Sequence, residues 1–145
     1  MRSTSQKLRT HSRHSSSRVT PSASSRLQIA ALAETFVADR LRLKGWTVVA
    51  RNYRAVGTEL DIVAAKGSII TIFEVKARRR LPQSVEEILP FKKRRALERG
   101  ARRIISERGL PFGGICFDLV IVLMTSDSLI SGMRYFPRVF EVRNL

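Results

Sequence analysis

Apolar residues begin to recur at helical spacing only after residue 26 of this chain. The recurring positions within 27–44 are Ile29, Leu32, Ala33, Phe36 and Val37. This period predicts an amphipathic helix, and Gly45 is placed to end it in a left-handed conformation. Residues 1–26 contain nine serines, six Lys or Arg and no acid, so we expect a disordered basic tail there and one folded domain over 27–145.

Runs rich in β-branched residues follow this helix. Residues 46–51 predict a first strand, and 52–57 predict a loop. The next two runs, 58–65 and 68–76, are separated only by Lys66-Gly67. A two-residue connection that ends in glycine is typical of a β-hairpin, so we predict that these two runs pair with each other.

The second half of the chain predicts one more helix and further strands. A basic connection over 77–90 leads to a helix from Pro90 to about Arg108, in which the expected buried positions are Leu97, Ala101, Ile104 and Ile105. The continuously apolar run 115–124 predicts a strand in the centre of the sheet. Residues 129–136 and 139–142 predict later strands. The order α-β-β-β-α-β, followed by one or two strands, is that of an α/β domain.

Charged residues of the predicted hairpin are spaced so that they come together. If Lys66-Gly67 forms the loop, Glu59 lies opposite Glu74, and residues two apart on a strand share its face. We therefore predict that one face carries Glu59, Asp61, Glu74 and Lys76. A three-residue loop would break this parity.

Three carboxylates on one face repel each other unless a cation neutralises them. Mg²⁺ or Mn²⁺ binds carboxylate oxygens, carbonyls and waters, so we interpret Asp61 and Glu74 as metal ligands and Glu59 as a supporting acid. Lys76 could hydrogen-bond the attacking water, lower the pKa of that water or stabilise charge in the transition state. The alternative is a solvent-facing sheet with surface charges, against which the isoleucines on the same face argue.

Charged residues outside the hairpin could join this site. Glu34 lies on a stripe of small and apolar residues, which indicates a metal or water ligand, or else an edge residue paired with Arg54. Lys93 lies on the line of buried residues of the second helix and could contact a phosphate, or could be a surface lysine. Asp118 is interpreted as a structural acid paired with an arginine, or as a group behind the site. The predicted phosphate-contacting surface comprises Lys92, Lys93, Arg94 and Arg95 with Arg99, Arg102 and Arg103, and Arg78, Arg79 and Arg80 could extend it.

The net charge of the chain indicates a polyanionic partner. Twenty-seven Lys and Arg against 12 Asp and Glu give +15, and the domain over 27–145 keeps 21 basic and 12 acidic residues, or +9. A surface with this bias attracts nucleic acid, although the charge alone would also fit ribosomes or an anionic membrane.

Several function classes are excluded by the residues that the sequence lacks. Both histidines, His11 and His14, lie in the tail, which leaves none in the domain for a serine hydrolase triad or a histidine metal site. The single cysteine, Cys116, is interpreted as a buried apolar residue, and it rules out an intrachain disulfide and a cysteine-rich zinc site. No apolar stretch is long enough for a membrane span, and no secretory apolar region is visible. We expect a cytoplasmic protein, although the tail also resembles an organelle transit peptide in composition.

An acid on one strand followed by acid-x-Lys on the next resembles the PD-(D/E)xK nuclease superfamily. Over roughly residues 27–142 the chain looks more closely like the YraN family of bacterial proteins. The matching segments are Ala33-Glu34 with Ala38, Arg51 to Arg54, Gly57 to Val63, Phe73 to Lys76 with Arg78, Glu87 to Lys93, Leu97, Ala101 and Phe117-Asp118. Ala30, Ala33 and Thr58 depart from the family, which prefers glycine at these positions.

The resemblance implies a restriction-endonuclease-like αβββαβ core, with a mixed central sheet flanked by helices as in Holliday-junction resolvases. The implied catalytic residues are Asp61, Glu74, Lys76 and Glu34, and the implied metal ligands are Asp61, Glu74, Glu34 and the carbonyl of Val75. We expect a Mg²⁺- or Mn²⁺-dependent nuclease that hydrolyses DNA, branched or single-stranded, and a homodimer is compatible with a junction-type substrate. The alternatives are a non-catalytic nucleic-acid-binding protein that kept the fold, or an assembly subunit.

Overall fold

The computed structural model describes residues 20–55, 57–110 and 113–142. Its elements are α1 (Ala23–Leu43), β1 (Thr47–Ala55), β2 (Thr58–Lys66), β3 (Ile69–Arg78), α2 (Val85–Ile88), α3 (Phe91–Arg108), β4 (Ile115–Met124) and β5 (Ile130–Val142). The strands form one sheet in the order β1-β2-β3-β4-β5, in which β3 and β4 are parallel and the other neighbours are antiparallel. The predicted αβββαβ order and mixed sheet are therefore confirmed.

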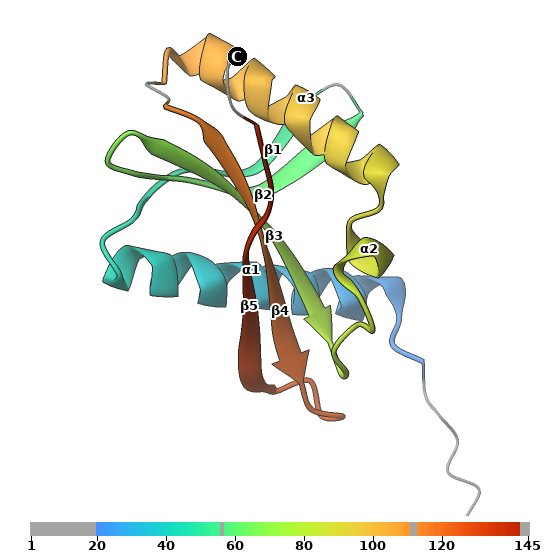
Figure 1. Ribbon diagram of the computed structural model, residues 1–145. Coiled ribbons are helices and arrows are strands. Elements are labelled where there is room, and N and C mark those ends of the chain that lie inside the picture. Colours follow the sequence, from blue (N-terminus) through green and yellow to red (C-terminus); the bar gives the residue numbers. More distant parts are fainter. Residues whose placement is uncertain (1–19, 56, 111–112, 143–145) are drawn as a thin grey trace, which may run out of the picture.

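Helices α1 and α3 cover opposite faces of this sheet (Figure 1). On one face, α1 contributes Ala33, Val37, Ala38 and Leu41 to a core with Ile62, Phe73 and Val120. On the other face, α3 contributes Leu97, Ala101 and Ile104 to a core with Leu60, Ile72 and Leu119. Strand β4 is apolar almost throughout because it lies inside the sheet, between β3 and β5, with both faces covered. Among the described residues, no helix has the length and apolar character needed to cross a membrane.

Three element boundaries differ from the prediction. Helix α1 begins at Ala23, where Ser22 caps it by accepting a hydrogen bond from the backbone N–H of Ser25 at 3.2 Å. Residues 23–26, which were predicted to belong to the tail, are therefore helical. A capped and exposed first turn needs no apolar residue, so the apolar pattern did not reveal it. Residues 1–19 of the predicted tail lie outside the described part. Strand β1 continues to Ala55, through most of the predicted loop, and a single strand β5 replaces the two predicted last strands.

The loop of the β2–β3 hairpin is Gly67-Ser68, since Lys66 pairs with Ile69. Gly67 has a φ of 60° and occupies the first loop position, as a type II′ turn requires. The predicted loop was one residue earlier, so the register differs by two positions along the partner strand. A shift of two preserves the face on which each side chain lies, so the predicted parity survives the wrong loop.

Candidate active site

Strands β2 and β3 separate at the end of their hairpin that lies away from the loop. Their pairing stops at Ile62 and Phe73. Beyond this point β2 stays paired with β1 as far as Thr58, and β3 stays paired with β4 as far as Arg78. A gap therefore opens between two strands that are each held firmly on their outer sides.

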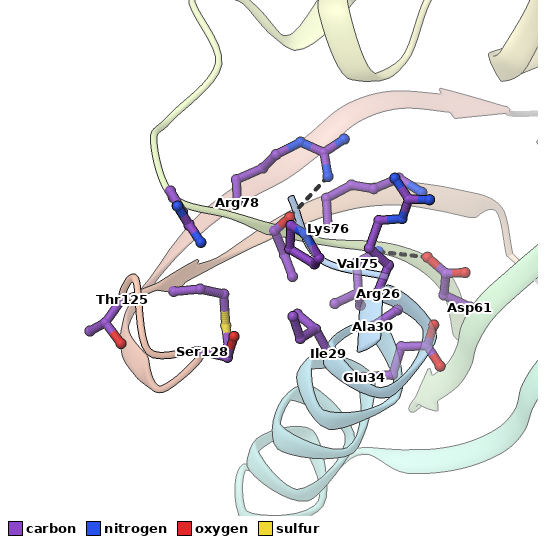
Figure 2. Close-up of a pocket in the computed structure, with 14 residues that line it drawn as sticks. Arg26, Ile29, Ala30, Glu34, Asp61, Val75, Lys76, Arg78, Thr125 and Ser128 are labelled. Carbon is purple, nitrogen blue, oxygen red and sulfur yellow. Dashed lines mark hydrogen bonds between the residues drawn. The ribbon is translucent and has the colours of Figure 1, made fainter. Parts of the chain in front are cut away.

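Asp61 lies where this gap opens. Its Oδ2 accepts a hydrogen bond of 2.8 Å from the backbone N–H of Val75, a group that has lost the backbone partner it would have had on β2 (Figure 2). In an extended strand the N–H and C=O of one residue point to the same side, so the carbonyl of Val75 also faces the gap. The backbone of β3 thus positions the Asp61 carboxylate, which is only 8% exposed.

The side chains of β2 change faces at this position. Ile62 packs in the core beneath α1, whereas Leu60 packs in the core beneath α3. Regular alternation would put residues two apart on the same face. On β1, the strand that pairs with the other edge of β2, Asn52 has a φ of 50°, so the backbone of β1 is irregular as well. This irregularity turns Asp61 toward β3.

Glu74 is buried beside the gap and is neutralised from two elements. Its Oε1 lies 2.9 Å from Nζ of Lys76 on β3 and 3.0 Å from Nζ of Lys93 on α3. The side chain of Glu74 is 2% exposed, and its Oε2 is buried without a hydrogen-bond partner among the described residues. A buried carboxylate oxygen without a partner is costly, and it is available to an added ligand.

Burial and crowding change the protonation of this group of residues. Burial raises the pKa of Asp61 to about 7, and the negative charge of Glu74 adds to the effect. The N–H of Val75 and the charge of Lys76 offset only part of this rise in the pKa of Asp61. Burial lowers the pKa of Lys76, but Glu74 and Asp61 outweigh it, so the pKa of Lys76 is raised. Lys76 is therefore a cation at neutral pH, while Asp61 is poised between its two forms.

Glu34 reaches the same cleft from α1. Asp61, Val75 and Lys76 line this cleft together with Glu34, and Figure 2 shows Glu34 and Asp61 on the same side of it. Burial raises the pKa of Glu34, opposed by a hydrogen bond from Asn52 and the charge of Arg51. The predicted alternative partner of Glu34, Arg54, is instead paired with Glu59 at 3.0 Å.

Glu59 does not line the cleft, although it lies near enough to Glu34 for its charge to raise the pKa of that residue. It pairs with Arg54 across the β1–β2 ladder. The structure brings Asp61, Glu74 and Lys76 near one another, but not on one shared face. Glu74 pairs with Lys93 of α3, whereas Asp61 lines the cleft with Glu34 of α1. The prediction for Glu59 was wrong because β2 changes faces between its position and the hairpin loop.

The predicted phosphate-contacting surface is divided among three environments. Lys93 points to Glu74, as its place on the buried line of α3 indicated. Arg94 donates from Nε to the carbonyl of Leu89 at 2.8 Å, so it holds the start of α3, while Lys92 and Arg95 are exposed on that helix. Arg78 is the last residue of β3 and lines the cleft that also contains Asp61. One continuous basic surface is therefore not formed by these residues.

Sequence reasoning missed Arg26, which lines the same cleft. It was assigned to the tail, yet it lies in the first turns of α1. Ser22 followed by Ala23 is a helix-start signal, and it could have shown that the helix already includes Arg26.

Asp118 has a structural place, apart from the cleft lining. It accepts hydrogen bonds from the hydroxyl of Tyr135 and, at 2.9 Å, from the backbone N–H of Arg138. Burial raises the pKa of Asp118. Asp118 thus has the structural role that one of its two interpretations predicted, but its partners are a tyrosine hydroxyl and a backbone N–H. It ties β4 to the irregular part of β5, where Arg138 has a φ of 48°.

The donor atoms around the gap suit a divalent cation that keeps part of its water shell. Among the described residues, no three His, Cys, Asp or Glu side chains form a cluster that could hold a metal ion. Asp61 and Glu74 are nevertheless close enough for the charge of Glu74 to raise the pKa of Asp61, and the carbonyl of Val75 faces the same gap. Mg²⁺ usually takes one or two carboxylates and keeps several waters, so two carboxylates and one carbonyl are a sufficient donor set.

Comparison with known proteins identifies the family. The model of the uncharacterised protein family UPF0102 matches residues 33–122, a range that includes Glu34, Asp61, Glu74 and Lys76. The chain belongs to this family. A UPF0102 protein of Dictyoglomus turgidum is 31% identical over 114 residues, which cover 78% of this chain and 97% of that protein. UPF0102 proteins of Paramagnetospirillum magneticum and Streptomyces coelicolor are 38% and 39% identical over 63% of this chain, and the matches cover 74% and 72% of those proteins.

Proposed function

We propose that this UPF0102 protein is a metal-dependent nuclease that hydrolyses phosphodiester bonds of DNA. The observation that carries the proposal is the gap between β2 and β3, where a buried carboxylate pair meets the backbone of Val75. An acid pair of this kind is unfavourable in the metal-free protein, since burial and the charge of Glu74 raise the pKa of Asp61 to about 7. A site that keeps such an acid pair beside lysines is suited to binding a cation and an anion together.

Mg²⁺ or Mn²⁺ would be held by Asp61, Glu74 and the carbonyl of Val75, with Glu34 as a further ligand or a ligand to water. When bound, the ion would neutralise phosphate charge and lower the pKa of a bound water. Glu34 lines the same cleft and has a raised pKa, so it can hold or accept a proton at the edge of the site.

Lys76 would act beside these acids. Its side chain is 28% exposed and lines the cleft, while its Nζ contacts Glu74 at 2.9 Å. Its raised pKa keeps it charged at neutral pH. Lys76 would therefore orient the attacking water and stabilise negative charge on the phosphate as the bond breaks, rather than accept a proton.

Net charge and cysteine content support two further parts of the proposal. The chain carries +15, which favours a polyanion such as DNA as the partner. A single cysteine suits a reducing compartment, and we propose the cytoplasm as the place of action.

The test is cleavage of labelled duplex, single-stranded, flap and four-way-junction DNA with Mg²⁺, Mn²⁺ or EDTA. We expect metal-dependent cleavage by the wild type, and a loss of about 10²–10⁴-fold in Asp61→Asn and Lys76→Met. Asp39→Asn is the matched control, because Asp39 is an exposed acid paired with Arg42 on the surface of α1. Undiminished cleavage in both site variants would refute the assignment of the site.

The alternative is a nucleic-acid-binding protein without catalysis. One observation favours it: Glu74 is already neutralised by Lys76 and Lys93, so the acid pair is partly balanced without an ion. This alternative predicts binding that weakens with salt and no turnover with either metal. The same DNA panel therefore separates the two functions.

A further inference from the structure

The cleft of Asp61 continues beyond the acids. Past the acidic end it is lined by Arg26 of α1, by Arg78 and Arg79 at the end of β3, and by Thr125 and Ser128 of the β4–β5 connection. In Figure 2, Asp61 and Glu34 lie on one side, Thr125 and Ser128 lie on the other, and Arg26 and Arg78 lie between them. We call the part lined by Arg26, Arg78 and Arg79 the arginine cleft.

The arginine cleft is suited to phosphate. Its three guanidinium groups belong to exposed residues, and no acid other than Glu34 and Asp61 is among the described residues that line the whole cleft. The start of α1 lies at this end, since Pro21 also lines the cleft. The first turn of α1 contains no acid, so the positive end of the helix dipole adds to the arginine charges there.

The arginines keep donors for a ligand. Arg78 donates to the carbonyl of Ala77 at 2.9 Å, and Arg79 donates to the carbonyl of Ser126 at 3.5 Å. Each of these bonds uses one of the five N–H groups of a guanidinium. The bonds place the two groups beside the cleft, and the remaining N–H groups can reach phosphate oxygens in a bidentate manner.

Four of the cations of α3 are paired within the protein. Lys93 pairs with Glu74, Arg94 with Leu89 and Glu86, Arg102 with Glu98, and Arg103 with Glu107. Lys92, Arg95 and Arg99 of the same helix are exposed, so the outer face of α3 is the competing surface against which the arginine cleft has to be tested.

We propose that the arginine cleft, rather than the outer face of α3, holds one strand of nucleic acid next to the phosphate that is cleaved. This inference rests on the proposed function and names the substrate path. A single strand fits because the cleft has walls on both sides, α1 on one and β3 with the β4–β5 connection on the other.

The test is the salt dependence of binding of a short fluorescent single-stranded DNA, measured by anisotropy without metal in the Asp61→Asn background. The double variant Arg26→Ala/Arg79→Ala removes two exposed charges from the cleft. Arg95→Ala/Arg99→Ala removes two exposed charges from α3 and has the same net charge. Each phosphate contact on a single strand contributes about 0.7 to the slope of log K against log salt, so we expect the slope to fall by about 1.4 in the cleft variant and to stay unchanged in the α3 variant.

Three results would overturn the inference. An unchanged slope in the cleft variant would show that the strand does not pass these arginines. Equal losses in both double variants would indicate attraction to the net charge alone. Tighter binding of a duplex of the same length, with the same loss in the cleft variant, would overturn the assignment of a single strand. Binding needs neither metal nor turnover, so a cleft-dependent slope without cleavage by the wild type would refute the nuclease and leave the strand path standing.

Discussion

Replacing Asp61 with asparagine should stabilise the metal-free protein at neutral and alkaline pH. The asparagine carbonyl can still accept the hydrogen bond from the N–H of Val75, which is 2.8 Å long in the wild type. The variant loses only the buried negative charge, which burial and Glu74 make unfavourable. A gain in stability on mutation is the expected sign for a residue kept for function.

The magnitude follows from the pKa of Asp61, which rises from 3.8 to about 7 on folding. Each pKa unit corresponds to about 1.4 kcal/mol, so the charged form costs the folded state up to about 4 kcal/mol. The unfolded chain releases this proton near pH 4, whereas the folded protein keeps it until about pH 7. The folded state binds more protons in this window, so the stability of the wild type relative to Asp61→Asn falls from about pH 4 to about pH 7 and is constant above it.

The assay is urea or thermal unfolding of both proteins at pH 4, 6 and 8 in EDTA, with Asp39→Asn as the control for removal of an exposed acid. At pH 8 we expect the variant to unfold about 10 °C higher, since about 1 kcal/mol shifts the midpoint by roughly 3 °C in a domain of this size. At pH 4 the two midpoints should coincide. Adding Mg²⁺ at pH 8 should stabilise the wild type by about 2.7 kcal/mol at a hundred times its Kd, and should leave Asp61→Asn unchanged. A variant that is less stable than the wild type at pH 8 would refute the reasoning.

Three other changes test separate parts of the structure. Lys93→Met leaves buried Glu74 with one ion-pair partner instead of two. Denaturant unfolding in EDTA should therefore show a loss of about 1–2 kcal/mol in the free energy of unfolding. A loss of the same size in Mg²⁺ would contradict a metal at Glu74. Gly100→Ala places a Cβ 2.9 Å from Cγ2 of Thr58 and should lower the free energy of unfolding by about 1 kcal/mol net. The double variant Gly100→Ala/Thr58→Ser removes that methyl group and should regain the loss. Equal stability of the single and double variants would exclude the contact as the cause. Asp118→Asn removes a charge that, together with burial, raises the pKa of Tyr135. Ultraviolet titration of the variant should therefore show one of the two tyrosines ionising at lower pH than in the wild type. DNA cleavage should persist, and its loss would place Asp118 in the active site.

The order of elements could be predicted because each helix and strand has its own period and punctuation. Gly45 follows the end of α1 in the left-handed conformation that its position predicted, with a φ of 87°. The hairpin loop could not be placed to the residue, because Lys66-Gly67 and Gly67-Ser68 are both acceptable two-residue loops. Only the strand pairing, with Lys66 opposite Ile69, distinguishes them.

The nearness of Asp61, Glu74 and Lys76 could be predicted from their positions on two paired strands, but the face on which each side chain lies could not. The exclusion of Glu59 could not be predicted either, since it follows from the change of faces between Leu60 and Ile62. Such a change depends on how two strands diverge in three dimensions. The two lysines on Glu74 were likewise beyond the sequence, because Lys93 reaches it from another layer of the domain.

The hydrogen bond between Asp61 and Val75 makes one amide proton of β3 a spectroscopic probe of the site. A carboxylate that shares its lone pairs with a cation accepts a weaker hydrogen bond, so the amide resonance of Val75 should move when an ion is added. The amides of Phe73 and Thr71 point to the same side as that of Val75 but belong to the regular ladder with β2, so they provide internal references in the same spectrum. Ion occupancy could thus be followed by magnetic resonance in the intact protein, independently of any nucleic acid.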